Sequence, residues 1–263
     1  ADGKGLTGLA HACRKGHVEV AMALISAEPS CLRARDEYGV NGLMVACLHG
    51  KVPVATTLLE AAPDLLDVAA SDGKTPLMLS CEGGHVETAA YLLERGASAA
   101  AVDGSAANSL IGAAANGHLE VVKLLVEREG LGTDVNATDD DGDSALAQAG
   151  GNGHGAVVDY LLSKGATCDF FTHAMVGHLS GVVHAVEQGG QDVNALDDDG
   201  ATALMGASTK GHVAVVEYLL GQGAVCDVQA GPGLTALIMA ASENQLEVVK
   251  ALLLAGADPT LEI

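Results

Sequence analysis

Histidine and cysteine are the residue types in this chain that could supply a nucleophile, a base or a metal site. Six of the ten histidines follow a glycine in one recurring motif, which indicates a structural role with the imidazole hydrogen-bonded to backbone at a turn. These are His17, His85, His118, His154, His178 and His212. A catalytic centre needs a nucleophile, a base and a charge stabiliser that converge, so we predict that the chain is not an enzyme.

The other candidates for metal binding lack the spacing of a known site. One histidine-rich segment follows Cys168, with His173, His178 and His184, but its intervals match no zinc pairing. The run Asp139–Gly142 resembles part of a calcium loop, yet the count from Gly142 places Ala137 and Gln148 at the first and last ligand positions. We therefore predict no metal and no cofactor.

The composition combines a high apolar content with a strong negative charge. The 263 residues carry 34 acidic and 13 basic side chains, a formal charge of −21, and 49% are apolar while 2% are aromatic. This apolar content is too high for a disordered acidic chain. A surface this negative repels phosphates, so we expect neither nucleic acid nor an anionic membrane as a partner, and no apolar run approaches the ~18 residues of a membrane span.

The six cysteines are scattered among apolar residues without a CxxC pair. This pattern is typical of free thiols that behave as small apolar residues in a reducing compartment. We therefore expect an intracellular, cytoplasmic protein, with the nucleus as an alternative.

A Gly-His dipeptide followed by apolar pairs recurs through the chain. Including degenerate copies at Gly50-Lys51 and Asn244-Gln245, the motif begins at positions 16, 50, 84, 117, 153, 177, 211 and 244. The steps are 33 to 36 residues, except for 24 between positions 153 and 177. This period predicts eight units of about 33 residues that account for the whole chain.

Each unit is predicted to contain two helices. About nine residues before the motif stands a small polar residue suited to a helix N-cap: Thr7, Asn41, Thr75, Asn108, Ser144, Thr202 and Thr235. A second helix follows the motif and ends at a glycine suited to the left-handed conformation: Gly96, Gly165, Gly189, Gly223 and Gly256. Turn residues such as Asp139–Gly142 then predict projecting two-stranded fingers.

Several segments resemble consensus ankyrin repeats, namely 74–77, 117–125, 256–258 and the Asp-Val-Asn-Ala links at 134–137 and 192–195. The resemblance covers residues 2–263 and implies an all-α repeat solenoid of helix-turn-helix units with β-hairpin fingers and a concave groove that holds other proteins. We predict a single ankyrin-repeat domain over residues 1–263. Its repeats are expected at about 2–35, 36–69, 70–102, 103–138, 139–169, 170–196, 197–229 and 230–263.

The sixth repeat lacks about nine residues, which correspond to its finger and its usual helix start. Cys168 and Asp169 are then expected at the N-cap and the first helical position, and the only two phenylalanines, Phe170 and Phe171, follow directly. The rings either fill the space that a finger would cover or form an aromatic anchor for a partner in a notch of the groove. We also hypothesise that repeats one to five and repeats six to eight flex at this notch.

Acidic side chains are concentrated in residues 129–209, which hold thirteen of them against one basic side chain, Lys164. One interpretation is that they form turns and keep the array soluble. The other is an electronegative surface for a Lys- or Arg-rich partner, made of Asp139, Asp140, Asp141, Asp143, Asp197, Asp198 and Asp199. Basic residues gather near the start instead: Lys4, Arg14, Lys15, Arg33, Arg35 and Lys51.

These features predict a non-catalytic scaffold, a monomeric array that binds another protein through its finger tips and inner-helix positions. The inner-helix candidates are Arg14, Lys15, Leu48, His49, Glu82, Asn116, Asn152, Thr209, Lys210, Ser242 and Glu243. The alternative is a substrate-recruiting or regulatory segment of a larger enzyme, ubiquitin-ligase adaptor or channel, and a structural spacer is a third reading. Because the chain begins and ends on a repeat, we expect a segment of a longer polypeptide. The resemblance also implies that Asn136 and Asn194 are candidates for hydroxylation by an asparaginyl hydroxylase.

Overall fold

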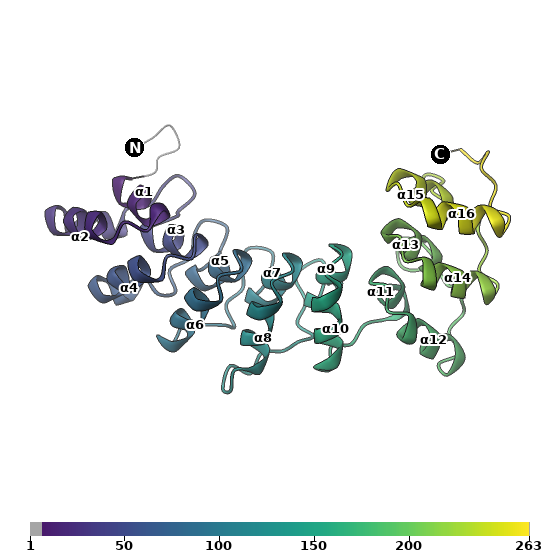
Figure 1. The fold of residues 1–263 in the computed structure, drawn as a ribbon, viewed down its shortest axis with the longest axis horizontal. Coiled ribbons are helices and arrows are strands. Elements are labelled where there is room, and N and C mark those ends of the chain that lie inside the picture. The colour runs from purple at the N-terminus through teal and green to yellow at the C-terminus, as the bar shows by residue number, and fades with distance from the viewer. Residues whose placement is uncertain (1–6, 263) are drawn as a thin grey trace. The chain divides into compact units, whose positions relative to one another are not determined.

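Helices make up nearly all of the regular structure. The computed structural model describes residues 7–262, and this range contains sixteen α-helices and two short 3-10 helices, η1 (Pro29–Arg33) and η2 (Pro63–Leu65) (Figure 1). The α-helices form one pair per predicted repeat: α1 Gly8–Lys15 with α2 Val18–Ala27, α3 Gly42–Leu48 with α4 Val52–Ala61, α5 Pro76–Glu82 with α6 Val86–Glu94, α7 Ser109–Ala115 with α8 Leu119–Glu127, α9 Ala145–Gly151 with α10 Gly155–Ser163, α11 Phe170–Met175 with α12 Leu179–Glu187, α13 Ala203–Lys210 with α14 Val213–Gly221, and α15 Ala236–Ser242 with α16 Leu246–Leu254. The predicted all-α repeat fold is confirmed. Lys4 and the expected first finger lie outside the described residues.

The chain divides into two compact units. The N-terminal unit is Ala1–Gln148 with Asp159–Ala166, and the C-terminal unit is Ala149–Val158 with Thr167–Ile263. In the N-terminal unit the first helices of successive repeats pack side by side in the order α1, α3, α5, α7, and the second helices α2, α4, α6, α8 follow the same order. In the C-terminal unit α11, α13 and α15 pack in the same way, as do α12, α14 and α16. The single-domain assignment and the flexing at repeat six stay predictions.

Small aliphatic side chains fill the core of both units. The leucine two positions after each N-cap is buried in seven repeats: Leu9, Leu43, Leu77, Leu110, Leu146, Leu204 and Leu237. Small residues such as Ala113, Ala207 and Ala240 are 0% exposed, so neighbouring helices approach closely there. Within residues 7–262, no helix is both long enough and apolar enough to cross a membrane.

Polar side chains cap the first helix of each repeat. The side chains of Thr7, Asn41, Thr75, Asn108, Ser144, Thr202 and Thr235 each accept a hydrogen bond from the backbone N–H three residues later, which confirms these seven N-caps. The expectation for repeat six was wrong by one residue. Asp169 is the N-cap, because its Oδ1 accepts from Thr172 N at 2.7 Å and α11 begins at Phe170. A carboxylate is a much better acceptor than the Cys168 thiol, so the helix starts one position later.

The Gly-His slot, meaning the two residues at the motif positions, connects neighbouring repeats at several places in the chain. His118 Nε2 lies 2.8 Å from the carbonyl oxygen of Glu82 in the preceding repeat, and its ring covers the slot glycine there, Gly84. The same pair of contacts is made by His85 with Leu48 O and Gly50, and by His212 with Met175 O and Gly177. The predicted structural role is confirmed for these three histidines.

The degenerate slots keep the geometry with other side chains. Gln245 Nε2 donates to Thr209 O at 3.2 Å, so an amide replaces the imidazole. Asn244 adopts a left-handed backbone, φ +57°, as the slot glycines do. For His178 the expected backbone hydrogen bond was wrong. Its ring contacts His173 and Ser180 instead, and no described atom lies within 4 Å of a Cβ built at Gly153, the glycine it would cover.

The glycine that ends the second helix is left-handed where predicted in four repeats: Gly96, Gly165, Gly223 and Gly256 have φ between +87° and +95°. In repeat six the prediction of Gly189 was wrong, because the positive φ of +67° belongs to Gly190. The N–H groups of Gln188 and Gly189 both bond to His184 O, so the helical turn runs one residue further before the chain reverses.

The fingers are shorter than two-stranded ribbons. Within residues 7–262 five of them are closed by one antiparallel bridge each, and the structure contains no extended strand there. The fifth finger (residues 138–144) closes through Thr138 and Ser144, and the seventh finger (residues 196–202) through Leu196 and Thr202. A loop this small has little backbone pairing, so side-chain hydrogen bonds must hold its shape.

Candidate functional site

The first aspartate of each acidic run holds its own finger in shape. Asp139 Oδ1 accepts hydrogen bonds from Asp141 N at 3.1 Å and Asp143 N at 2.8 Å, and Asp197 Oδ1 accepts from Asp199 N and Ala201 N. Asp36 and Asp103 do the same in the second and fourth fingers. Asp139 and Asp197 therefore have a structural task, in line with the turn-forming interpretation.

Asp143 is also turned toward its own repeat. Its Oδ2 accepts from Gln148 Nε2 on α9 at 3.1 Å, and the residue is only half exposed. Burial, together with the charges of Asp139 and Asp141, raises the pKa of the Asp143 carboxyl. The Asp143 carboxylate is thus held by Gln148 and is less available to a partner than those of the exposed Asp140 and Asp141.

Four acidic side chains remain exposed at the finger tips. Asp140 and Asp141 lie on the fifth finger in the N-terminal unit, and Asp198 and Asp199 lie on the seventh finger in the C-terminal unit. The backbone N–H of Asp140 donates to Ser105 O of the fourth finger at 2.9 Å, which fixes the fifth finger against its neighbour. Each tip therefore carries two exposed carboxylates on a turn whose backbone is held by the first aspartate of the run.

Most inner-helix candidates of the N-terminal unit have contacts within the chain. Glu82 forms an ion pair with Lys74 at 2.8 Å, with side chains 24% and 30% exposed. Burial lowers the pKa of Lys74, but the hydrogen bond and charge of Glu82, with Asp72 and Asp103, outweigh it and raise the pKa overall. His49 Nδ1 lies 3.1 Å from Val45 O.

Arg14 is half-buried, and several other inner-helix candidates are exposed. Arg14 Nη2 lies 3.2 Å from His11 Nδ1, while Lys15 is exposed at the end of α1. Asn116 is exposed and donates to Gly112 O at 2.9 Å. Exposed positions in the C-terminal unit include Asn152 and Lys210, whose Nζ donates to Gly151 O. Lys15 and Lys210 are separate cations on different units, and a role for either in partner binding stays a prediction.

The two phenylalanines of repeat six pack against each other and against the core. Phe170 is 6% exposed and belongs to the core of the C-terminal unit, and Phe171 packs against that core. Their ring centroids are 5.6 Å apart in an edge-to-face arrangement. This geometry favours the space-filling interpretation for Phe170, because a buried ring has little surface to offer a partner.

Titratable groups meet beside the missing finger. His173 Nδ1 lies 3.0 Å from both Cys168 Sγ and His178 Nδ1, and Ser180 Oγ lies 2.8 Å from His178 Nε2. Burial lowers the pKa of His173, with a further contribution from His178, and burial raises the pKa of the Cys168 thiol to about 12. Among residues 7–262, no group of three or more His, Cys, Asp or Glu side chains has the arrangement of a metal site. All six cysteines are free thiols.

The hydroxylation candidates are held in the links between repeats. Asn194 Oδ1 accepts from Val225 N at 2.8 Å and its Nδ2 donates to Gly223 O at 3.2 Å. Asn136 N donates to Asp134 Oδ1 at 2.9 Å. Asn194 therefore joins two successive links with both of its amide atoms. Hydroxylation stays a prediction.

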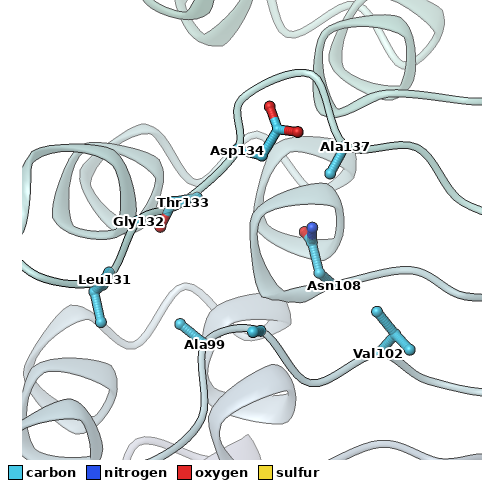
Figure 2. A pocket seen from close by; sticks show the side chains of 9 residues that line it. Ala99, Val102, Asn108, Leu131, Gly132, Thr133, Asp134 and Ala137 are labelled. Carbon is cyan, nitrogen blue, oxygen red and sulfur yellow. The ribbon is translucent and has the colours of Figure 1, made fainter.

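Sequence reasoning missed a pocket of about 240 Å³ at the base of the fourth finger (residues 102–108), here called the finger-base pocket. Figure 2 shows it between the segment that precedes this finger and the loop that follows α8. Its apolar lining is Ala99, Ala100, Val102, Leu131 and Ala137, and Asn108, Thr133 and Asp134 supply polar groups. The one sequence signal was the long 36-residue step between slots 117 and 153, which places extra residues in this loop.

A second hollow of about 350 Å³ lies between the second and third fingers and was also missed. It is lined by Tyr38, Val40, Lys74 and Leu79 with neighbouring backbone. Tyr38 is 63% exposed, and an exposed tyrosine beside a hollow is a common anchor in protein interfaces. The sequence pattern gave no reason to separate Tyr38 from the other finger residues.

Comparisons with known proteins agree with the repeat architecture. A family model described as ankyrin repeats (3 copies) matches residues 1–69, 43–103, 61–139, 101–172 and 170–263. The ankyrin repeat and KH domain-containing protein mask-1 of Caenorhabditis elegans is 33% identical over 159 residues, 57% of this chain and 6% of that protein. The ankyrin repeat and SAM domain-containing protein 6 of Danio rerio is 36% identical over 119 residues, and the E3 ubiquitin-protein ligase Ufd4 of Drosophila melanogaster is 44% identical over 77 residues.

The matched regions cover 45% and 29% of this chain for the latter two relatives, and 16% and 3% of those proteins. The chain thus spans a small part of each relative, and the shared part is the repeat array. Family matches that together span residues 1–263, eight helix pairs and the slot contacts between repeats lead to one conclusion. The chain belongs to the ankyrin-repeat family.

Proposed function

We propose that this array is a non-catalytic interaction module that holds a Lys- or Arg-rich segment of another protein at its acidic finger tips. Ankyrin repeats mediate protein–protein interaction, and the comparisons show no catalytic family over this chain. The observation that carries the proposal is the preorganised pair Asp140 and Asp141, exposed on a turn that Asp139 already closes. Because this turn is already ordered, binding a partner does not require the full loss of conformational entropy that ordering a flexible loop would cost.

The sign of the charge supports a basic partner. Residues 129–209 carry thirteen acidic side chains against Lys164 alone, and Lys164 is already paired with Glu127 at 3.0 Å. A field of this kind attracts a cationic segment and raises its association rate, and salt screens the effect. The seventh finger, with Asp198 and Asp199, offers a second exposed pair within the C-terminal unit.

The test uses short fluorescent peptides rich in lysine and arginine, with a charge-reversed peptide of the same length as a specificity control. We expect the basic peptides alone to bind, with an affinity that falls at least tenfold between about 50 and about 300 mM salt. The double variants D140N/D141N and D198N/D199N should each weaken binding. A control variant, E87Q/E217Q, removes two charges from the second helices and should change binding little. Equal binding by the charge-reversed peptide, or binding that does not depend on salt, contradicts the proposal.

The alternative, a substrate-recruiting segment of a larger enzyme, is favoured by one observation. Two matched relatives are described as E3 ubiquitin-protein ligases, Ufd4 of Drosophila melanogaster and hecd-1 of Caenorhabditis elegans, and this chain covers 3% of each. The two proposals share the same finger surface and differ in what the rest of the polypeptide does. Sequencing the complete reading frame distinguishes them, since a catalytic domain in the same chain favours the alternative.

We also propose an intracellular, cytoplasmic location and a monomeric array. Six free thiols support a reducing compartment, and burial raises the pKa of the Cys13 and Cys81 thiols to about 12, so these behave as apolar core groups. Imaging of the tagged protein and light scattering of the purified chain test the two statements separately.

A further inference from the structure

We propose that the finger-base pocket is a specificity subsite for one aliphatic side chain of the partner, with a lysine or arginine beside it pairing with Asp134. This inference rests on the proposed function. It adds that the basic segment of the partner should contain an aliphatic residue next to a lysine or arginine. Figure 2 shows the parts of the subsite: Ala99 and Leu131 on facing segments, Val102 and Ala137 farther along, and the Asp134 carboxylate at the rim.

The chemistry of the lining selects an apolar guest. The oxygen atoms of two polar lining residues already make hydrogen bonds within the chain: Asn108 Oδ1 accepts from Leu110 N and Ile111 N, and Thr133 Oγ1 donates to Leu125 O at 2.8 Å. Most of the surface left for a guest is the aliphatic surface of five side chains. Val102 is 52% exposed, and covering it removes apolar surface from water.

The size of the pocket selects a single side chain. Its volume of about 240 Å³ lies below the ~300–1,000 Å³ of sites that enclose a small-molecule ligand. The pocket also lies on loops at the edge of the array, where an extended peptide could reach it from the fingers. A leucine, isoleucine or methionine side chain fits this volume and chemistry better than a free metabolite does.

An extra stretch of chain builds one wall. Asp103 in the fourth finger lies nine positions after the end of α6 at Glu94, whereas the equivalent Asp139 in the fifth finger lies twelve positions after the end of α8 at Glu127. Leu131 stands within this longer segment, between Gly130 and Gly132, which both have a positive φ. The insertion therefore gives this repeat a wall that a loop of ordinary length lacks.

The charge at the rim selects the neighbouring residue of the partner. Asp134 is exposed, its Oδ1 accepts from Asn136 N at 2.9 Å, and within residues 7–262 no hydrogen bond or ion pair involves its Oδ2. A guanidinium or ammonium group can occupy that oxygen without breaking the link that Oδ1 makes. The acidic fifth finger comes next in the chain and belongs to the same unit. A basic peptide bound at the finger-base pocket is therefore also attracted by the negative charges of this finger.

The test compares basic peptides that differ at one central position, leucine, serine or aspartate, against the complete chain. We expect the leucine peptide to bind about fivefold or more tightly than the serine peptide. Ala100→Phe, an exposed position, should fill the pocket and abolish this preference while leaving the residual affinity for basic peptides. Asp134→Asn keeps the acceptor for Asn136 N and should weaken both peptides equally. Val225→Ser, which removes an equally exposed valine from the C-terminal unit, is the matched control and should leave the preference unchanged.

Methyl NMR of the complete chain gives a direct readout of the site. The leucine peptide should shift the methyl signals of Val102 and Leu131 and leave those of Val225 in place. Basic peptides that bind equally well with any central residue overturn the subsite and leave the proposed function standing. Peptides that fail to bind regardless of charge overturn both.

Discussion

The imidazole of His118 lies directly over Gly84 of the preceding repeat, so close that a Cβ at Gly84 would stand 2.6 Å from His118 Nδ1. The same ring reaches Glu82 O at 2.8 Å. The glycine and the histidine of the motif therefore form one contact between neighbouring repeats. The glycine belongs to one repeat and the histidine to the next.

Gly84→Ala tests the steric half of this contact. The residue has φ +72°, so alanine incurs left-handed strain of ~1 kcal/mol, and the clash with the His118 ring should bring the total loss of unfolding free energy to roughly 3 kcal/mol. Gly96→Ala is the matched control: its φ is +91°, but no described atom lies within 4 Å of the new Cβ, so it should lose only about 1 kcal/mol. Urea unfolding of both variants gives the difference, and equal losses would mean that the ring contact is unimportant.

His118→Ala tests the hydrogen-bonding half. Loss of the donor leaves Glu82 O unpaired, and we expect a loss of about 1 kcal/mol in the free energy of unfolding. His118→Gln should recover most of it, because Gln245 makes the equivalent bond to Thr209 O. Denaturant titration monitored by circular dichroism measures both. If glutamine were as destabilising as alanine, the bond to the backbone would not be what the slot requires.

Asp139→Ala should destabilise the fifth finger, whereas Asp140→Ala should not. Asp139 Oδ1 accepts two backbone N–H groups of its own turn, a contact comparable to a helix N-cap and worth about 1 kcal/mol, while the Asp140 side chain is exposed. Hydrogen exchange at Asp141 N and Asp143 N reports the opening of the turn. Asp139→Asn keeps the acceptor and should protect these amides nearly as well as the parent chain. Unchanged exchange in Asp139→Ala would contradict the structural role.

Acid should destabilise the C-terminal unit through His173. Burial and the neighbouring His178 and His184 lower its pKa from the ordinary 6.5, against a smaller opposing effect of Asp169. The unfolded chain then binds the proton more readily than the folded one, so stability is full above pH 6.5 and falls as the pH drops from 6.5 to the lower folded value. His212, whose pKa is also lowered by burial, adds to the effect.

The measurement is the urea midpoint at pH 7.5 and at pH 5.5, for the parent chain and for His173→Gln. We expect His173→Gln to be less sensitive to acid than the parent chain. The sensitivity that remains in the variant is expected to come from His212. NMR titration of the His173 ring gives its pKa directly. A ring that titrates at or above 6.5 would rule out this explanation of the acid sensitivity.

Local chemistry explains why most of the fold could be predicted. A threonine, serine or asparagine before an apolar run is a strong N-cap signal, and all seven such predictions hold. The errors occur in repeat six, where the missing finger removes the usual pattern. There Asp169 caps the helix in place of Cys168, and Gly190 reverses the chain in place of Gly189.

The candidate site was less predictable because its properties depend on side chains from different repeats. Sequence marks seven acidic finger residues alike, but hydrogen bonds separate Asp139 and Asp197, which shape the turns, from the exposed Asp140, Asp141, Asp198 and Asp199. The finger-base pocket needs Ala99 and Leu131 to lie on facing segments about 30 residues apart in the chain, which no local pattern encodes.

The direction of the slot contact has a consequence for synthesis on the ribosome. At three slots the histidine that covers the slot glycine comes from the following repeat: His85 covers Gly50, His118 covers Gly84 and His212 covers Gly177. A repeat that has just emerged therefore has its turn uncovered, and it is secured only when its successor appears. Translation from the N-terminus supplies these successors in order, so at these three junctions the newer repeat covers the turn of the one made before it, and this part of folding proceeds in the direction of synthesis.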